Sequence, residues 1–571
     1  MVLLVAAALR LVMFGDAPPG LQHDEIFKAQ EGQLLILRGD WRLFYPSNQG
    51  HEGLYVWLPG ASYLLFGASV MMIKFPPFVI GMLTVALTYR VIGEIFNRRV
   101  AFIAAGLTAV SFWAVFTNRV GLRANLLPLV ALLVVWGLHR LIRIKVEKQF
   151  EPQSHKDHRE NGWRTALLTG LMLGLAIYTY TSSFALYVAY GGFIVTLMIF
   201  RRRVFRAAWR QLLLVGVLAG VLALPMVYIR LTDPEGTNRV STISRPMTEF
   251  LAGKPQELID NGFKLAGMAA FTGDPEWRYN VANRPLFVLP IGLLVYIGFS
   301  VALWRVRKQP MISLFLIFAT VGLIPSLLTV SAPSYLRSIL ALPAVMLFVA
   351  LAIDLIPQKR AVWGLGALVI AVTGVVDANA YFVIWLHNDE VHSIYRDDLA
   401  IAAKSLPDDG DGSQVLITTS NTGLDPLLFA YYQPAETAPV TFFDGRTTIA
   451  LSDQLALLLV SPLSGITPPH ADWLTAAQGT TSLPPLYRKD GKIAYEVYQL
   501  NAGEALQARL AQVQTRPVYL YAETEFPRGA VDEWAQAIPY PVNFGDMVQL
   551  VGVDVAQRDI ATEQDGVNIQ L

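Results

Sequence analysis

Long apolar stretches dominate the first two thirds of the chain, and polar residues are confined to the short connections between them. A helix needs about 20 predominantly apolar residues to cross a bilayer. Ten stretches approach or reach that length, at residues 75–96, 100–117, 124–142, 165–181, 183–200, 211–230, 285–303, 311–330, 338–356 and 361–386. Residues 1–15 predict a further span, which either begins upstream of this sequence or enters the membrane obliquely.

The apolar segment at residues 54–70 decides the predicted topology. Pro59 and Gly60 weaken it as a straight spanning helix, so we expect it to lie in the membrane interface. The chain then has eleven spans, and all strongly basic connections fall on one side. By the positive-inside tendency this side is the cytoplasm. The connections are Arg98 with Arg99, residues 140–164, residues 201–210, residues 304–308, and Lys359 with Arg360.

Four segments share the opposite, extracytoplasmic face in this topology. They are the loop from Asp16 to Lys74, the turn at residues 118–123, the loop at residues 231–284, and everything after about residue 387. Acids occur early in these segments and several arginines occur later. The pattern predicts an active site assembled from loops, with a base and an anionic ligand such as phosphate.

The composition changes to that of a soluble domain after Tyr381 and Trp385, two aromatics suited to a membrane interface. We predict an α/β domain over residues 387–502, with strands in SQVLITTS, PVTFFDG, QLALLLVSP and IAYEVYQL and a helix in DPLLFAYYQ. Residues 503–571 predict strands alone, in RPVYLYAETEF, VNFGDMVQLVGVDV and DGVNIQL. Because the chain stops inside the last, we expect an incomplete β-sandwich.

The overall composition excludes several classes of function. Hydrophobic residues make up 54% of the 571 residues and charged residues 16%, which is typical of a multi-span α-helical membrane protein. A net charge of +1, with basic residues in short clusters, gives no support for nucleic-acid binding. Cysteine is absent, which excludes thiol nucleophiles, disulfides and thiolate zinc sites.

The loop PPGLQHDE at residues 18–25 carries the strongest candidate for catalysis. Asp24 and Glu25 lie at a boundary between water and membrane, where ionisable groups usually mark a site and a carboxylate is a natural proton acceptor. The alternative is that the pair caps an interfacial helix beginning near Ile26.

Arginines and tyrosines supply candidate ligands. Arg119 and Arg123 in the turn NRVGLR can bind phosphate oxygens, or can be ordinary interfacial arginines whose charged ends reach toward water. Arg278 and Arg337 are further phosphate candidates. Tyr178 and Tyr180 can face a sugar or a prenyl chain, although packing is their ordinary role.

Several of these motifs together resemble a known group of membrane enzymes. PPGLQHDE, LRGDW, GHEGLYVWLPGASYLLFG and FNRRVAFIAAGLTAVSFWAVFTNRVGLR occur in order, followed by GDPEWRYNVANRPLF at 273–287 and SAPSYLRSILALPA at 331–344. The set resembles the protein O-mannosyltransferase and aminoarabinose-transferase relatives (bacterial family 39-like) of the GT-C glycosyltransferase superfamily. The similarity covers roughly residues 1–386, which the resemblance identifies as a transmembrane GT-C domain.

The resemblance implies transfer of a sugar from a polyprenyl-phosphate donor to a protein, lipid or glycan acceptor at the outer face of the plasma membrane, with inversion. Asp24 matches the family's acidic position and is the expected base, and Glu25 is expected to orient it or the acceptor. One carboxylate suffices because a lipid phosphate leaves without a general acid, unlike the alkoxide in glycoside hydrolysis. His51 and Glu52 stand where relatives often carry an arginine and a glutamate.

Alternatives remain at this stage. No cofactor is expected, but His23, Asp24, Glu25 and Glu52 can be combined into a divalent-cation site, as in some GT-C enzymes. The sequence lacks the arginine that many relatives place just after the tyrosines at 178 and 180. Two rival classes of protein are a transporter, which would place charges near the membrane midplane, and an inactive surface-assembly protein. The sugar and the acceptor are left open.

Overall fold

The computed structural model describes residues 1–150, 162–232, 245–407, 414–433, 438–448, 450, 455–468, 471 and 481–501, together with four short strands beyond residue 517. Two compact units are present. The first comprises Met1–Lys404 and Gly423–Gln433, and the second comprises Ser405–Thr422 and Pro434–Leu571.

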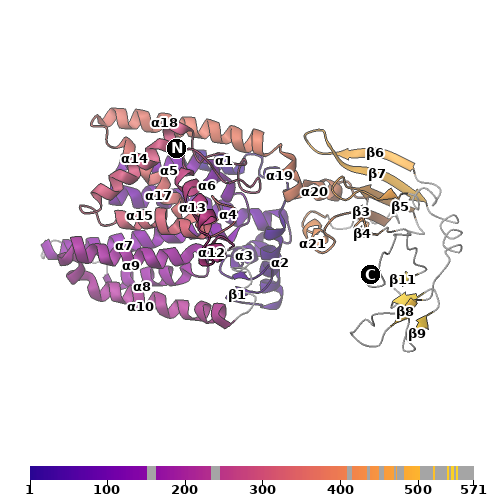
Figure 1. Cartoon of the computed structure of the whole chain (residues 1–571), viewed down its shortest axis with the longest axis horizontal. Helices are drawn as coiled ribbons and strands as arrows, with labels where there is room; N and C mark the ends of the chain where they lie inside the picture. Colours follow the sequence, from indigo (N-terminus) through magenta and orange to yellow (C-terminus); the bar gives the residue numbers. More distant parts are fainter. Residues whose placement is uncertain are drawn as a thin grey trace. The chain divides into compact units, whose positions relative to one another are not determined.

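The first unit is almost entirely helical (Figure 1). Its N-terminal half contains α1 (Val2–Leu11), α2 (His23–Arg38), β1 (Phe44–Tyr45), β2 (His51–Glu52), α3 (Trp57–Phe66), α4 (Val70–Ile95), α5 (Arg98–Val110), α6 (Phe112–Thr117), α7 (Leu126–Phe150), α8 (Gly162–Ala176), α9 (Phe184–Phe200) and α10 (Arg202–Thr232). Its remainder contains α12 (Arg245–Leu251), α13 (Gln256–Gly267), α14 (Leu289–Arg305), α15 (Ile312–Thr320), α16 (Ile324–Leu327), α17 (Leu342–Ile353), α18 (Lys359–Asn379), a π-helical turn (Ala380–Trp385), α19 (Asp389–Tyr395), α20 (Asp397–Lys404) and α21 (Asp425–Phe429).

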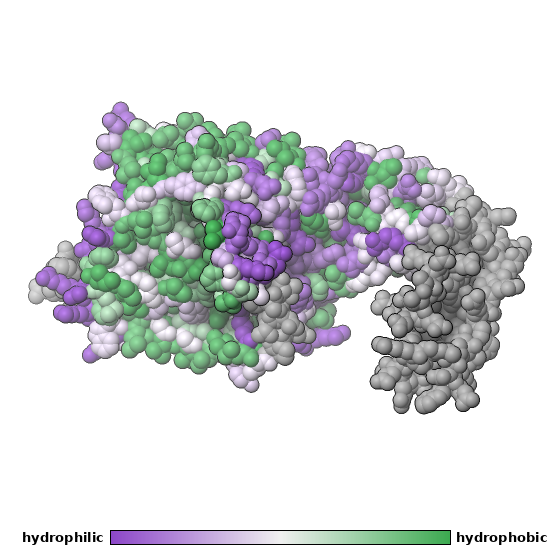
Figure 2. Space-filling view, viewed as in Figure 1, coloured by the Kyte–Doolittle hydropathy of each residue, from purple (hydrophilic) through white to green (hydrophobic). Residues whose placement is uncertain are grey.

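Each predicted spanning stretch contains a helix or a pair of helices. Within the described residues, five helices are long and apolar enough to cross a membrane: Val70–Ile95, Arg123–Ile144, Thr181–Phe200, Arg202–Thr232 and Lys359–Trp385. Shorter apolar helices accompany them, including Val2–Leu11 and Leu289–Arg305. Apolar residues cover much of the helical unit's visible face (Figure 2). The exposed apolar residues of this unit include Leu213, Leu224 and Leu293. Exposure of such residues to lipid rather than water is typical of a membrane protein.

Helix α3 accounts for part of the ambiguous segment at residues 54–70. It is ten residues long, which gives a length of about 15 Å against the roughly 30 Å of a bilayer core. It packs against α2 and α4. The contact with α2 is close, since a Cβ on Gly32 would lie 2.7 Å from the backbone nitrogen of Gly60. Alone, therefore, α3 is too short to span.

The second unit is built around a five-stranded mixed sheet in the order β4-β3-β5-β7-β6. Strands β3, β4 and β5 are parallel, and β7 pairs antiparallel with both β5 and β6. Four of the strands and α21 lie where the sequence predicts them, and β6 was not predicted. The sheet strands are β3 (Gln414–Thr418), β4 (Val440–Phe443), β5 (Leu455–Val460), β6 (Thr481–Tyr487) and β7 (Ile493–Asn501).

Beyond the sheet, four short strands form two antiparallel pairs, β8 with β9 and β10 with β11. Three of them fall in predicted strand segments, whereas β9 does not. The predicted strand in DGVNIQL lies outside the described residues. The pairs comprise β8 (Val518–Leu520), β9 (Gln536–Ile538), β10 (Val542–Phe544) and β11 (Val548–Leu550).

Close packing of α14 against α17 gives a first testable prediction. A Cβ on Gly298 would lie 1.8 Å from the carbonyl oxygen of Phe348, so Gly298→Ala must push the two helices apart. We expect a loss of about 1–3 kcal/mol, seen as a lower melting temperature in detergent. Gly364→Ala in α18 is the matched control, because no atom lies within 4 Å of its new Cβ. Equal melting temperatures for the two variants would contradict the packing.

Candidate functional site

The acidic loop ends in helix α2, which begins at His23 rather than near Ile26. Three consecutive residues in its first turn contact three separate parts of the chain. His23 contacts Asp425 of α21, Asp24 contacts Asn48, and Glu25 contacts Gly121 in the NRVGLR turn. The first turn of a helix has no internal partners for its N–H groups and is free to fray. These contacts hold it in place.

Asp24 retains access to solvent. Its side chain is 27% exposed, and Asn48 Nδ2 donates to Oδ1 at 2.8 Å. The guanidinium of Arg278 lies 3.9 Å from Oδ2. One carboxylate oxygen is thus held by an amide and the other faces a cation at the edge of ion-pair distance. A base needs such a combination of fixed orientation and access.

Glu25 is buried and makes contacts of a different kind. The N–H of Gly121 donates to Oε1 at 2.6 Å and the N–H of Gln22 donates to Oε2 at 3.1 Å. The second bond is half of a capping box that closes the start of α2. Burial raises the pKa of Glu25, opposed by Lys74 and these N–H donors. The geometry gives Glu25 a role in joining α2 to the arginine-bearing turn, without direct access to an acceptor.

The hairpin formed by β1 and β2 is fastened to α2 through Glu31, a residue not singled out in the sequence. Ser47 donates to Glu31, and Nε2 of His51 lies 2.6 Å from Glu31 Oε2. The His51 ring stacks on Tyr45. Burial raises the pKa of Glu31 to about 7. His51 is fully buried in these contacts, so it supports the hairpin rather than facing a ligand directly.

Glu52, the last residue of the hairpin, gathers two arginines from distant helices. Arg123 Nε lies 3.1 Å from Oε2, and Arg230 pairs with Oε1, which also accepts from Thr181 at 3.1 Å. Glu52 is buried, Arg123 is nearly so, and the Arg230 side chain is 34% exposed. Arg230 Nε is buried and has no hydrogen-bond partner among the described residues. Unsatisfied buried groups of this kind are typical of a ligand site.

Arg119 is a correction to the predicted phosphate ligands. Its guanidinium is buried and donates to the backbone carbonyls of Leu9, Val12, Met13 and Ala17 at 2.7–2.9 Å. These carbonyls belong to the end of α1 and the loop that follows it. Arg119 therefore fixes the loop that leads to Asp24, and four of its five N–H donors are occupied by these carbonyls.

The two isolated arginines, Arg278 and Arg337, differ in their acidic neighbours. Arg278 faces Asp24, as described above. Arg337 is half-buried, and within the described part of the chain no carboxylate comes within ion-pair distance of it. Its charge acts on Asp274, a buried residue that accepts from the N–H groups of Glu276 and Tyr335. Arg337 is thus left with a charge that an anionic ligand can balance.

Because the Asp274 carboxyl is buried, we expect the stability of the folded protein to depend on pH. Burial raises its pKa from 3.8 to about 7 in the folded protein, so folding favours the protonated form. That stabilisation is complete below about 3.8 and disappears as the pH rises through about 7. We expect the free energy of unfolding to rise by roughly 1 kcal/mol per pH unit as the pH falls from 7.5 to 5.5, seen as a higher melting temperature. Asp274→Asn should lose this component, and an unchanged pH slope in the variant would contradict it.

The two candidate tyrosines differ in their surroundings. Tyr178 is buried and donates to the carbonyl of Leu222 at 2.7 Å, which is a packing role. Tyr180 is half-buried, with the Arg123 guanidinium 5.6 Å from the centre of its ring. Of the two tyrosines, only Tyr180 therefore lies beside Arg123, one of the two arginines that pair with Glu52.

The residues combined into the alternative metal site have separate partners in the described structure. Three of its four members have different partners: His23 contacts Asp425, Glu25 contacts backbone N–H groups and Glu52 contacts arginines. Within the described ranges, no three His, Asp or Glu residues come together at metal-binding distance.

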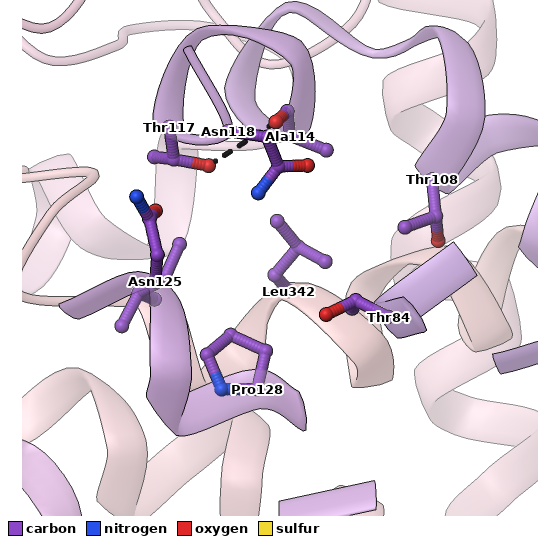
Figure 3. Close-up of a pocket in the computed structure, with 9 residues that line it drawn as sticks. Thr84, Thr108, Ala114, Thr117, Asn118, Asn125, Pro128 and Leu342 are labelled. Carbon is purple, nitrogen blue, oxygen red and sulfur yellow. Dashed lines mark hydrogen bonds between the residues drawn. The ribbon is translucent and has the colours of Figure 1, made fainter. Parts of the chain in front are cut away.

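A small polar cavity lies among the helices, lined by Thr84, Thr117, Asn118 and Asn125 among others (Figure 3). Its volume is about 10 Å³, enough for one water molecule and far too small for a sugar. Arg10 donates to Asn118 Oδ1 beside it. None of the residues that line this cavity belongs to the acidic loop at residues 18–25.

The sequence reasoning missed Asn48, Glu31 and Arg230. Asn48 and Glu31 lie in the predicted outer loop, but nothing in their spacing pairs them with Asp24 or His51. Arg230 is the last residue of a predicted span and carried a detectable signal, because a charge at the end of an apolar stretch faces an interface.

Comparisons with known proteins give one family match. Residues 53–229 match the family described as dolichyl-phosphate-mannose-protein mannosyltransferase. This segment includes Arg119 and Arg123, and it begins immediately after Glu52. None of the curated proteins compared with the chain matches it.

Two solved structures illustrate the extent of structural likeness. ArnT from Cupriavidus metallidurans bound to undecaprenyl phosphate is 14% identical, with 88% of this chain and 96% of that chain covered and a TM-score of 0.46. The oligosaccharyltransferase AglB from Archaeoglobus fulgidus, in complex with an inhibitory peptide and a dolichol-phosphate, is 14% identical with a TM-score of 0.43. Coverage there is 76% of this chain, which spans 63% of AglB's length.

We base no assignment of residues or substrate on likenesses this distant. The family match is independent of them and falls within the part of the chain whose motifs carry the resemblance described above. The chain is therefore similar, over residues 53–229, to the dolichyl-phosphate-mannose-protein mannosyltransferase family, which confirms its resemblance to GT-C glycosyltransferases.

Proposed function

We propose that this protein is a membrane glycosyltransferase that moves a sugar from a polyprenyl-phosphate donor to an acceptor hydroxyl or amide, with inversion at the anomeric carbon. The observation that carries the proposal is the geometry of one hairpin. Asn48 in its turn holds the partly exposed Asp24, and Glu52 at its end gathers Arg123 and Arg230. A candidate base and a candidate anion site are thus fixed to the same short element.

Asp24 is the base in this reaction. It takes the proton from the acceptor as the acceptor attacks the anomeric carbon, and the bond from that carbon to the lipid phosphate breaks with the electron pair leaving on phosphate. The leaving phosphate needs charge stabilisation rather than a proton. A single carboxylate is sufficient for this scheme, and no metal is required.

Arginines supply the charge stabilisation. Arg123 and Arg230 share one carboxylate, so the group keeps a net positive charge, and Arg230 is partly exposed with an unpartnered Nε. Arg337 and Arg278 are the further candidates for the phosphate or for the sugar ring. Arginine forks suit phosphate oxygens because they donate two parallel hydrogen bonds.

The proposal includes the predicted topology. Eleven spans, with α3 in the interface, place this site and the C-terminal domain on the extracytoplasmic side of the plasma membrane. We also propose that the transmembrane domain ends near residue 386 and that residues 387–502 and 503–571 are two further domains. The description of the family matched over residues 53–229 names a dolichyl-phosphate-linked sugar and a protein, which supports a lipid-linked donor and is consistent with a protein acceptor.

A transfer assay tests the proposal. The full-length protein, in vesicles of polar bacterial lipids, is given a panel of radiolabelled polyprenyl-phosphate sugars with peptide, lipid and glycan acceptors. We expect transfer from at least one donor, with the anomeric configuration of the product opposite to that of the donor, and activity that survives a chelator. Uptake of sugar into vesicles without any transfer would favour a transporter and reject the proposal.

A further inference from the structure

The side chain of Asp425 is completely buried, although α21 follows strand β3 by only a few residues in the sequence. Its Oδ1 lies 2.8 Å from His23 Nε2, and its Oδ2 pairs with Arg396. Because Arg396 holds Asp425 as a charged acceptor, His23 Nε2 is the donor of the first contact. The segment Gly423–Gln433 belongs to the first compact unit, while the residues on both sides of it belong to the second.

The turn at Tyr395 and Arg396 connects the contact between His23 and Asp425 to Arg278, which faces the Asp24 carboxylate. Arg396 adopts a left-handed conformation, with a φ of 46°, between α19 and α20. The preceding residue, Tyr395, donates from Oη to the carbonyl of Arg278 at 2.9 Å. Tyr395 also touches the acidic loop, since a Cβ on Gly20 would lie 2.1 Å from its carbonyl oxygen. The same turn thus holds the loop before Asp24 and the backbone of the arginine that faces Asp24.

We propose that His23 is a positioning residue for Asp24, and that Asp425 is the anchor through which it acts. His23 is the first residue of α2 and Asp24 is the second, so the contact with Asp425 fixes the backbone that carries the Asp24 carboxylate. Residues in this first turn have no intrahelical bond from their N–H groups, and external anchors decide their position. The role rests on the proposed function, in which Asp24 is the base.

Through Asp425, helix α21 helps to position the proposed base. A segment inserted between two strands of the C-terminal sheet supplies a buried charge to the helix that carries the base. A displacement of about 1 Å in a catalytic group can lower the rate about a hundredfold. Loss of the His23 contact should therefore slow the reaction without changing the affinity for the donor.

Two substitutions of one residue test the contact in the full-length protein. His23→Phe keeps a ring of similar size but removes the donor, whereas His23→Gln supplies an amide N–H at a position close to that of Nε2. We expect kcat to fall about tenfold to a hundredfold in His23→Phe with an unchanged KM for the lipid-linked sugar, and to recover largely in His23→Gln. The control is His387→Phe, at an exposed histidine whose ring contacts only a neighbouring carbonyl among the described residues. A wild-type kcat in His23→Phe, or an equal loss in His23→Gln, would overturn the proposal.

A second measurement does not depend on turnover. Asp24 is partly exposed and Glu25 is buried, so a water-soluble carbodiimide should label Asp24 in preference to Glu25, with the rate at Asp24 followed by peptide mass spectrometry. We expect labelling to accelerate severalfold in His23→Phe and to stay near wild type in His23→Gln. If no lipid-linked sugar is transferred but labelling changes in this way, the anchoring stands and the proposed reaction fails. Unchanged labelling in a folded His23→Phe protein overturns the anchoring itself.

Discussion

Replacing Asp24 by asparagine is expected to lower kcat by about a hundredfold to ten-thousandfold, the range that general base catalysis contributes. The amide is nearly the same size and keeps an oxygen that can accept from Asn48, so the fold should be retained. It cannot take a proton from the acceptor. The measurement is single-turnover transfer from whichever lipid-linked sugar the wild-type protein accepts.

A matched control separates the loss of the base from the loss of a negative charge near the loop. Asp40 follows α2, and its side chain is 35% exposed in a surface pair with Arg42. Asp40→Asn should retain nearly the wild-type rate, because exposed ion pairs contribute little. The assignment of Asp24 is wrong if Asp24→Asn transfers sugar as fast as Asp40→Asn does. Equal thermal stability of the two variants confirms that the comparison concerns chemistry.

The helical framework was predictable from the sequence because the apolar stretches are long and sharply bounded by charges. The positions at which one apolar stretch is divided into two helices were not predictable. The stretch at residues 100–117 is divided into α5 and α6 at Ser111, whose hydroxyl accepts from the N–H of Ala114 and caps the second helix. A serine inside an apolar run gives no sign of which backbone group its hydroxyl will bind, because serine also fits within spanning helices.

In the C-terminal sheet, too, some strands were predictable from the sequence pattern, and one strand depends on its place in the sheet. Strands β3, β4, β5 and β7 were predicted because they are rich in β-branched and other apolar residues. Strand β6 was not, since its sequence TSLPPLY contains Pro484 and Pro485, which cannot donate to a neighbouring strand. The structure tolerates them because β6 is at the edge of the sheet and its register with β7 shifts between Leu483 and Leu486.

The site was predictable in its residue types and not in its pairings. Asp24 and Arg123 were singled out from their loops, and the structure connects both to the hairpin that carries Glu52. Arg119 looked equivalent to Arg123, only four residues away, yet it binds backbone carbonyls beside α1. Arg123 meets a carboxylate 71 residues away in the chain and Arg119 meets carbonyls up to 110 residues away, and single-sequence spacing does not contain that information.

Glu52 should be the residue whose loss most damages the folded protein. Its buried carboxylate balances Arg123, which is almost as deeply buried, and Arg230. Glu52→Ala removes the carboxylate that pairs with the buried Arg123 guanidinium, and breaking a buried ion pair typically costs about 3–5 kcal/mol. We therefore expect a large drop in melting temperature and in the yield of folded protein in detergent.

Arg230→Gln provides the contrast, because it removes the partly exposed member of the same group. Arg123 and Glu52 remain paired, so the protein should fold, with stability changed by far less than in Glu52→Ala. If Arg230 binds the donor phosphate, its loss should raise the KM for the lipid-linked sugar about tenfold or more, the usual value of a hydrogen bond to a charged group. A stable Glu52→Ala protein would show that Arg123 finds another partner. A stable Arg230→Gln protein with unchanged KM would confine this cluster to a structural role and leave Arg337 and Arg278 as the phosphate ligands.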